Sequence, residues 1–389
     1  MQLDFVLDEM KNRYDKVLDG YGEILPELVV ARKKRFGKLP LVFWTSLLLS
    51  HLRLRKFVGV KKLPEYIFIN VRYPEIILNY NKEDVAVIGG IKEFKFCFEN
   101  GYRFVWGGFI TRAFNLFYWA GETRPILAAI DYLTALLPTR QGFVFLWEDA
   151  LPTGIVLSKV VSKVDTICSI CIAHGCFGRS KTGITQVGEM CQANFVWSRN
   201  QIELFAQYGI DNCFILGVPY DIEAPSEVTN EVVLVGHCGR ESSDAEYFYT
   251  VSQFIKIHQI LCDAGCIVSY RPHPQDDLEM VKSVFPNVTR TLTKDLLRSR
   301  RGVYIGFAST FMFECKNSGS VVIGLATDWL SDERDFSVDA EVQPSEYAEL
   351  PALVRKLTME LYDKPMPDLA PLSSRLSCCM DELRTSMQE

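Results

Sequence analysis

Two apolar segments in the second half of the chain lead into residues that can hold an anion. Residues 264–268 lead into Arg271-Pro272-His273-Pro274, and residues 302–305 lead into Ser309-Thr310. In an open α/β sheet, ligands bind in the crevice beyond the carboxyl ends of the strands. A guanidinium, an imidazole and two hydroxyls at two such ends predict a site for a phosphorylated ligand.

The prolines on either side of His273 give the first motif its chemistry. Pro272 and Pro274 restrict the backbone and so aim the imidazole, which can donate to a phosphate or protonate it as it leaves. A helix beginning near Asp276 would point free N–H groups at the same anion. The plainer alternative is a solvated histidine in a rigid loop.

Small hydroxyl donors give the second motif its chemistry. Ser309 and Thr310 can bind phosphate oxygens at the start of a helix, or they are ordinary N-caps. Glu314, about one turn later, can accept from ribose hydroxyls or lie on the helix surface. Upstream, the turn that contains Gly236 can admit a phosphate and Arg240 can pair with it, as supporting features.

The first half of the chain offers two candidates for a general base, each again at the end of an apolar segment. Glu148-Asp149 follow residues 143–147, and His174-Gly175 follow residues 166–173. A carboxylate or an imidazole there can deprotonate an acceptor hydroxyl. The alternatives are that Asp149 caps a helix and that His174 is a structural residue of the cleft wall.

Strands that alternate with amphipathic helices predict an α/β protein with parallel sheets. Expected strands extend from residue 66 to residue 216 and resume at residues 232–235, after a polar stretch at 219–230. We predict two Rossmann-like domains facing a central cleft. Residues 1–222 form the acceptor-binding domain, 223–346 the nucleotide-sugar domain, and 347–389 a helix and a polar tail from Pro365.

Composition excludes several classes of protein. The chain has 389 residues, a net charge of −6 and a hydrophobic content of 48%, which argue for a globular protein and against a general nucleic-acid binder. Its 12 cysteines lack a small-scaffold framework and no secretory leader is apparent, so we expect a reduced, cytoplasmic protein. Cys168 and Cys171 near His174 could suggest zinc, but an apolar strand is the better interpretation.

A basic and aromatic segment lies near the amino end. Apolar residues 39–49 are flanked by Arg32-Lys33-Lys34-Arg35 and by basic residues at 53–62, and they are too few to span a bilayer. They suit either a segment that rests on anionic lipid or a buried helix with solvated ends.

These motifs resemble GT-B glycosyltransferases of bacterial surface polysaccharides. The pair formed by Arg271-Pro272-His273-Pro274 and Ser309-Thr310 is similar to the motifs with which sialyltransferases and capsule Kdo transferases hold CMP. Glu148-Asp149-Ala150 looks like their acidic motif, with Ala150 in place of the usual glycine. His174-Gly175 with the later Ile215-Leu216-Gly217-Val218-Pro219 resembles CDP-glycerol glycerophosphotransferases, in which a first-domain histidine is the base.

The resemblance implies a metal-independent, inverting transfer of sialic acid or Kdo from a CMP-sugar to a glycan or lipid-linked acceptor. It leaves open whether Asp149, Glu148 or His174 is the base, and it implies no cofactor. Such an enzyme would be cytoplasmic and peripheral to the inner face of the membrane. The alternatives are a glycerophosphotransferase, a UDP-sugar transferase, a UDP-sugar 2-epimerase and a nucleotide-binding protein without activity.

Overall fold

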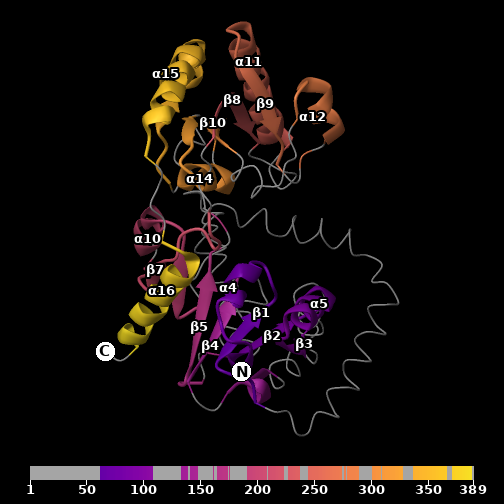
Figure 1. Ribbon diagram of the computed structural model, residues 1–389, viewed down its shortest axis with the longest axis vertical. Coiled ribbons are helices and arrows are strands. Elements are labelled where there is room, and N and C mark those ends of the chain that lie inside the picture. Colours follow the sequence, from indigo (N-terminus) through magenta and orange to yellow (C-terminus); the bar gives the residue numbers. More distant parts are fainter. Residues whose placement is uncertain are drawn as a thin grey trace. The chain divides into compact units, whose positions relative to one another are not determined.

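The chain forms two compact units in the computed structural model (Figure 1). The first unit comprises Met1–His174, Lys181–Pro219 and Ser373–Glu389, and the second comprises Gly175–Ser180 and Tyr220–Leu372. The structure describes residues 62–107, 133–138, 141–147, 161, 164–173, 175, 191–207, 209–222, 227–236, 244–273 (the backbone alone for 244–247), 276, 278–288, 300–307, 309–326, 336–365 and 370–387.

The first unit contains a seven-stranded, fully parallel sheet of order β3-β2-β1-β4-β5-β6-β7. Every residue of β2, β4, β5 and β6 is buried, as expected for apolar strands covered on both faces. The strands are β1 Tyr66–Ile69, β2 Val85–Gly89, β3 Arg103–Trp106, β4 Gly142–Leu146, β5 Ile167–Ile172, β6 Ala193–Val196 and β7 Cys213–Ile215.

Local sequence signals set the ends of the helices in this unit. Pro74 opens α4, the Ser198 hydroxyl caps α10 by accepting from the Gln201 amide, and Gly101 ends α5 with a φ of 75°. The elements are α4 Pro74–Leu78, the 3₁₀ helix η1 Lys82–Asp84, α5 Ile91–Asn100, α10 Arg199–Ala206 and α16 Leu372–Ser386.

The helix α16 corrects the prediction of a polar tail from Pro365. Its buried side chains recur at helical spacing and are Leu372, Leu376, Cys379, Met380 and Leu383. The Arg375 guanidinium donates to the Leu216 and Val218 carbonyls, on either side of Gly217, which has a φ of 73°. The interspersed polar residues of α16 are therefore its solvent face, not the mark of an unstructured tail.

The second unit contains a five-stranded, fully parallel sheet of order β12-β11-β10-β8-β9. The strands are β8 Val228–Val235, β9 Ile267–Arg271, β10 Arg301–Gly306, β11 Val321–Leu325 and β12 Ala340–Val342. The helices are α11 Asp244–Asp263, α12 Leu278–Val284, α14 Thr310–Asn317, the 3₁₀ helix η3 Pro344–Glu349 and α15 Leu350–Asp363.

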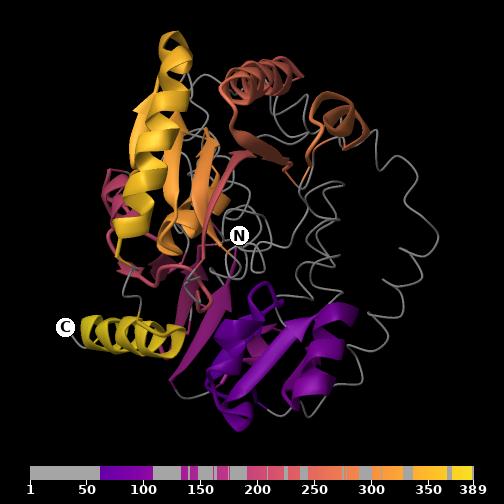
Figure 2. The same cartoon turned by 45° about the horizontal axis from the view of Figure 1, so that its top comes forward.

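Helices cover both faces of this second sheet (Figure 2). Val232 and Leu234 of β8 pack in one core with side chains of α11, α12 and α15. Val233 and Val235, which alternate with them, pack in another core with side chains of α14. Both faces are apolar, so the unit is a layered α/β sandwich.

The predicted α/β class with two parallel sheets is confirmed. Each predicted strand that the structure describes is a strand, whereas β12 lies outside the strands that were expected. The predicted boundary at residues 222/223 lies close to the division at Pro219/Tyr220, and residues 347–389 are divided between the two units.

None of the described helices is both long enough and apolar enough to cross a membrane.

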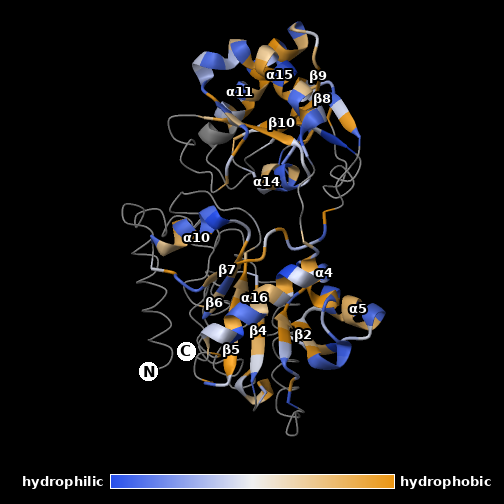
Figure 3. Ribbon diagram, turned by 60° about the vertical axis from the view of Figure 1, so that its left-hand side comes forward, coloured by the Kyte–Doolittle hydropathy of each residue, from blue (hydrophilic) through white to orange (hydrophobic). Residues whose placement is uncertain are grey.

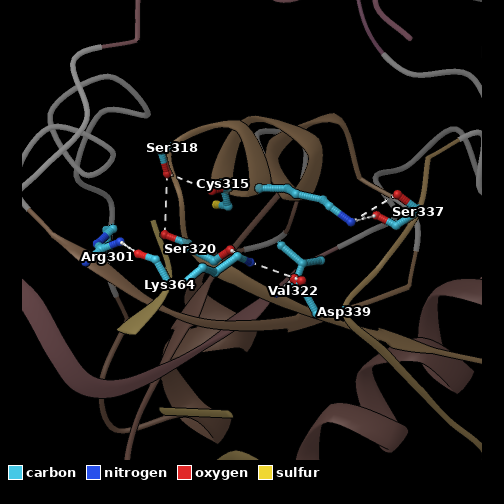
Figure 4. A network of polar contacts seen from close by, with 9 residues as sticks. Arg301, Cys315, Ser318, Ser320, Val322, Ser337, Asp339 and Lys364 are labelled. Carbon is cyan, nitrogen blue, oxygen red and sulfur yellow. Dashed lines mark hydrogen bonds and ion pairs between the residues drawn. The ribbon is translucent and has the colours of Figure 1, made fainter. Parts of the chain in front are cut away.

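A polar network ties the amino ends of two strands to the end of α15 (Figure 4). The Asp339 carboxylate accepts from the Val322 amide at 2.9 Å and from the Lys364 ammonium at 3.0 Å. Lys364 also donates to the Ser320 carbonyl, and its own carbonyl accepts from Arg301. Asp339 is thus the acceptor that holds β11, α15 and the segment before β12 together.

Replacing Asp339 by alanine should therefore destabilise the second unit. The Val322 amide and the Lys364 ammonium lose their shared acceptor in a partly buried position, so we expect a loss of about 1–3 kcal/mol. Urea unfolding of Asp339→Ala measures this loss. The matched control is Glu360→Ala, because among the described residues Glu360 pairs with Lys356 alone, in an exposed position. Equal destabilisation by the two variants would contradict the role given to the network.

Candidate functional site in the second unit

The order of the second sheet places the predicted phosphate-binding segments at one edge. Its first strand, β8, lies between β9 and β10. Along the chain, β9 is added on one side of β8 and the later strands on the other, so the strand order reverses at β8. Val235 at the end of β8 is in register with both Arg271 and Gly306. Ligands of open α/β sheets bind at such a switch point, beyond the carboxyl ends of the strands. The loops after β8, β9 and β10 are therefore the candidate site.

Gly236, the residue after β8, packs against the loop that follows β9. Its amide donates to the Arg271 carbonyl at 2.8 Å. A Cβ atom at this position would lie 2.8 Å from the His273 amide nitrogen and 3.0 Å from an Asp276 carboxylate oxygen. The missing side chain of Gly236 therefore makes room for the protein's own backbone, whereas its predicted contact with a phosphate stays a prediction.

Ser309 is the N-cap residue of α14, and its hydroxyl makes no capping hydrogen bond within the described part of the chain. By contrast, the Ser198 hydroxyl accepts from the Gln201 amide at 3.2 Å at the corresponding position of α10. Ser309 thus occupies the N-cap position that the alternative gave it, but its side chain makes no capping bond there. The helix α14 starts at the switch point, where an anion is favoured.

Thr310 begins α14 and lies against Gly175, which also belongs to the second unit. A Cβ atom on Gly175 would lie 2.5 Å from the Thr310 hydroxyl oxygen. Gly175 was predicted as a residue that permits a close backbone approach, and the approach that it permits here is that of Thr310.

Arg271, at the end of β9, belongs to a cluster of polar and aromatic side chains. Its guanidinium carbon lies 3.7 Å from the centre of the Phe311 ring, a cation–π geometry. Burial lowers the pKa of Arg271, and the nearby Glu314 carboxylate acts in the opposite direction. Arginine remains protonated in proteins, so a fixed positive charge stands at the switch point.

Glu314 is buried, and its carboxylate accepts a hydrogen bond from the Tyr220 hydroxyl. This position excludes the alternative of a helix-surface carboxylate. The predicted contact with a ribose hydroxyl stays a prediction. Tyr220 was not expected in the site, because its bond to Glu314 joins residues 94 positions apart in the chain.

The loop after β9 leads into α12, which starts at Leu278, close to the predicted start near Asp276. The Asp276 carboxylate accepts from the His273 amide at 2.7 Å and from the Tyr270 hydroxyl at 3.3 Å. This carboxylate was not expected to hold the backbone of the loop, and the predicted contact of the His273 imidazole with a phosphate stays a prediction. Burial raises the pKa of Asp276 to about 6.

The first sheet has a switch point as well, between β1 and β4, because its order begins 3-2-1-4. Asn70 follows β1 with a φ of 66°, and its carbonyl accepts from the Trp147 indole at 3.2 Å. A residue other than glycine in this left-handed conformation is uncommon, and such residues gather at functional sites. Asn70 was not predicted as a site residue, because in the sequence it is marked only as a polar residue after an apolar strand.

Several predicted site residues lie outside the described residues. They are the three candidate bases Glu148, Asp149 and His174, together with Arg240 and Pro274. The basic segment at 32–62 lies outside them except for its last residue. Their predicted roles stay predictions. Of the donor-binding residues, the structure brings Arg271, His273, Gly236, Ser309, Thr310 and Glu314 to one edge of the second sheet.

Cys168 and Cys171 lie in β5 and are buried. Burial raises the pKa of Cys168 to about 12, so its thiol stays protonated at neutral pH. Protonated thiols within a strand are the pattern expected of core residues.

The sequence matches no protein-family model and no curated protein. Among solved structures, the chain resembles the UDP-GlcNAc 2-epimerase of Methanocaldococcus jannaschii, solved in complex with UDP-GlcNAc and UDP. The TM-score is 0.51 and the identity 11%, over 82% of this chain and 100% of that one. A protein of Listeria monocytogenes described as a UDP-N-acetylglucosamine 2-epimerase has a TM-score of 0.51 and a sequence identity of 12% to this chain. The match covers 84% of this chain and 98% of that one. The spinosyn rhamnosyltransferase SpnG has a TM-score of 0.40 and a sequence identity of 10%, and the match covers 81% of this chain and 99% of that one. At such identities the likeness concerns the fold, which is of the GT-B type.

The raised pKa of Asp276 predicts a stability that depends on pH. The folded state holds this proton up to about pH 6, whereas the unfolded chain releases it near 3.8, so stability falls as the pH rises between these values. Asp276→Asn keeps an acceptor for the His273 amide but cannot ionise. Between pH 4 and pH 7 the variant should gain about 1–2 kcal/mol relative to the unaltered protein, with solvent screening allowed for.

Chemical unfolding at a series of pH values measures this difference. Asp263→Asn serves as the control, because Asp263 accepts only from the exposed Gln259 side chain among the described contacts. A constant difference between Asp276→Asn and the unaltered protein over this range would show that Asp276 has an ordinary pKa.

Proposed function

We propose that this protein is a glycosyltransferase that binds its nucleotide-sugar donor at the carboxyl edge of the second sheet. The observation that carries the proposal is the position of Ser309. This residue precedes α14 at a switch point of the sheet, and its hydroxyl makes no capping hydrogen bond within the described structure. The fold shared with nucleotide-sugar enzymes supports it.

The residues of the site have distinct roles in this proposal. Ser309 and Thr310 donate to the phosphate oxygens, and the charge of Arg271 stabilises the phosphate that departs as the sugar is transferred. His273 donates to or protonates the leaving phosphate. Asp149, Glu148 or His174 deprotonates the acceptor hydroxyl. The attack forms the new glycosidic bond as the bond to the leaving nucleotide breaks, in one inverting displacement without a metal.

The donor that we predicted is a CMP-sugar that carries sialic acid or Kdo, and the acceptor a glycan or a lipid-linked glycan. A UDP-sugar is the alternative donor. The epimerase that the chain resembles was solved with UDP-GlcNAc and UDP. Measuring which nucleotide binds will decide between these donors.

A second candidate function is a UDP-sugar 2-epimerase. It is favoured by one observation, the match to the whole length of the Methanocaldococcus jannaschii enzyme. An epimerase changes the sugar of its nucleotide substrate without an acceptor. Consumption of a nucleotide sugar without an acceptor therefore separates the two functions.

The binding prediction concerns Ser309→Ala. Thermal unfolding is measured in the presence of CMP, CDP, UDP, TDP or GDP. Nucleotides of one base should stabilise the folded protein, by about 2.7 kcal/mol when the nucleotide concentration is a hundred times its Kd. Ser309→Ala should lose most of this shift and keep the stability of the free protein, because no capping bond is removed. Ser198→Ala should do the opposite, with a loss of about 1 kcal/mol and an unchanged ligand shift. Loss of stability in free Ser309→Ala would show that it is an ordinary cap, and no response to any nucleotide would overturn the site.

The reaction prediction concerns the base. With the nucleotide sugar that binds, we expect release of the nucleotide only when an acceptor glycan is present, and the same rate in the presence of a chelator. Substitution of the true base, tested as His174→Ala, Asp149→Asn and Glu148→Gln, should slow transfer by at least about a hundredfold while nucleotide binding persists. Conversion of UDP-GlcNAc in the absence of acceptor would instead identify an epimerase.

A further inference from the structure

The helix α5 buries a carboxylate, Glu93, together with Cys97 and leaves several large apolar side chains exposed. Its inward residue Glu93 is buried, and the Glu93 carboxylate accepts from the Gly90 amide at 2.8 Å and the Val71 amide at 3.4 Å. Three large apolar side chains point outward instead. The exposed fractions are 77% for Ile91, 51% for Phe94 and 80% for Phe98. Surface helices of globular proteins normally turn the apolar stripe toward the core.

These side chains continue into a row of aromatic rings on the neighbouring edge strand β3. Phe94 lies 6.2 Å from Phe98 and 5.3 Å from Phe104, and Phe104 lies 6.1 Å from Trp106. Trp106 is 41% exposed. Figure 3 shows the ribbon of α5 coloured by hydropathy, with hydrophobic and hydrophilic positions interspersed along it. The α5/β3 face is defined here as Ile91, Phe94, Phe98, Phe104 and Trp106, of which the four aromatic residues are in contact. Such patches mark contacts with proteins or membranes.

The charges around the α5/β3 face differ from those of the chain as a whole. The exposed charged side chains of α5 are Lys92, Lys95 and Glu99; Lys92 donates to the Val71 carbonyl at 3.1 Å, and Lys95 lies 3.8 Å from Glu99. Arg103 alternates with Phe104 and Trp106 along β3 and so lies on the other face of the sheet. Cations therefore prevail here, although the chain carries a net charge of −6. Lysine is depleted in protein–protein interfaces. By contrast, lysines beside phenylalanine and tryptophan are typical of helices that lie in the headgroup region of a membrane.

We propose that the α5/β3 face is a docking surface for anionic lipid. The aromatic rings enter the boundary between headgroups and acyl chains, and Lys92 and Lys95 meet the lipid phosphates. This surface is separate from the basic segment at 32–62 and does not depend on the proposed reaction. It holds the first unit at a membrane surface, as a peripheral protein.

The test is binding of the full-length chain to vesicles of mixed phosphatidylglycerol and phosphatidylcholine, measured by flotation. We expect binding that weakens with salt and is lost on pure phosphatidylcholine. The double substitution Phe94→Ser with Phe98→Ser should weaken partitioning by about tenfold or more, because two exposed rings no longer enter the lipid. Phe248→Ser is the matched control, since Phe248 is 60% exposed on α11 of the second unit. Thermal unfolding of each variant verifies that it folds.

A second measurement locates the contact. In Phe98→Trp, brominated acyl chains should quench the added indole, and in Phe248→Trp they should not. The proposal is overturned if the unaltered chain ignores anionic vesicles, or if the double variant binds them equally well, which would place binding elsewhere. It is also overturned if the unaltered chain dimerises in solution and the double variant does not, because the face would then bind a second copy.

Discussion

Every strand in both sheets runs parallel to its neighbours, and the rest of the molecule depends on this constraint. Parallel pairing turns all carboxyl ends of a sheet toward one edge, so residues far apart in the chain meet there. Gly236, Arg271 and Ser309 are brought together in this way, each as the residue at or just after the end of a strand. The pairing also requires a crossover between successive strands, and crossover helices such as α11 and α14 cover the second sheet together with α15, which follows the last strand.

Apolar runs predicted the fold well, because a parallel strand buried on both faces leaves an uninterrupted apolar signature such as residues 142–146. The same rule could not find α16 or β12. α16 has many polar residues on its outer face, and its five buried side chains are interspersed among these polar residues in the sequence. The three residues of β12 are too short for a pattern, and they form a strand because β11 offers a free edge.

The site was predictable where its chemistry is local and unpredictable where it depends on distant partners. Ser309 and Arg271 could be identified from their place after apolar segments. The bond from Tyr220 to Glu314 could not, since nothing near either residue announces the other. The bond from the His273 amide to Asp276 was also not predicted, although it joins residues only three positions apart, because the turn that brings them together depends on the packing of Gly236 against this loop. In both cases a carboxylate near the carboxyl ends of the strands accepts a hydrogen bond from another residue of the second unit and so holds that residue in place.

The two units are not consecutive in the chain, because α16 returns to the first unit after the whole second unit has been traversed. Arg375 and Arg384 of α16 bind groups that lie more than a hundred residues upstream, at Leu216 and Tyr66. During synthesis on the ribosome, the second unit can therefore close while the first still lacks its final helix. The first unit spends that interval without the buried side chains and the two arginine contacts that α16 adds to it.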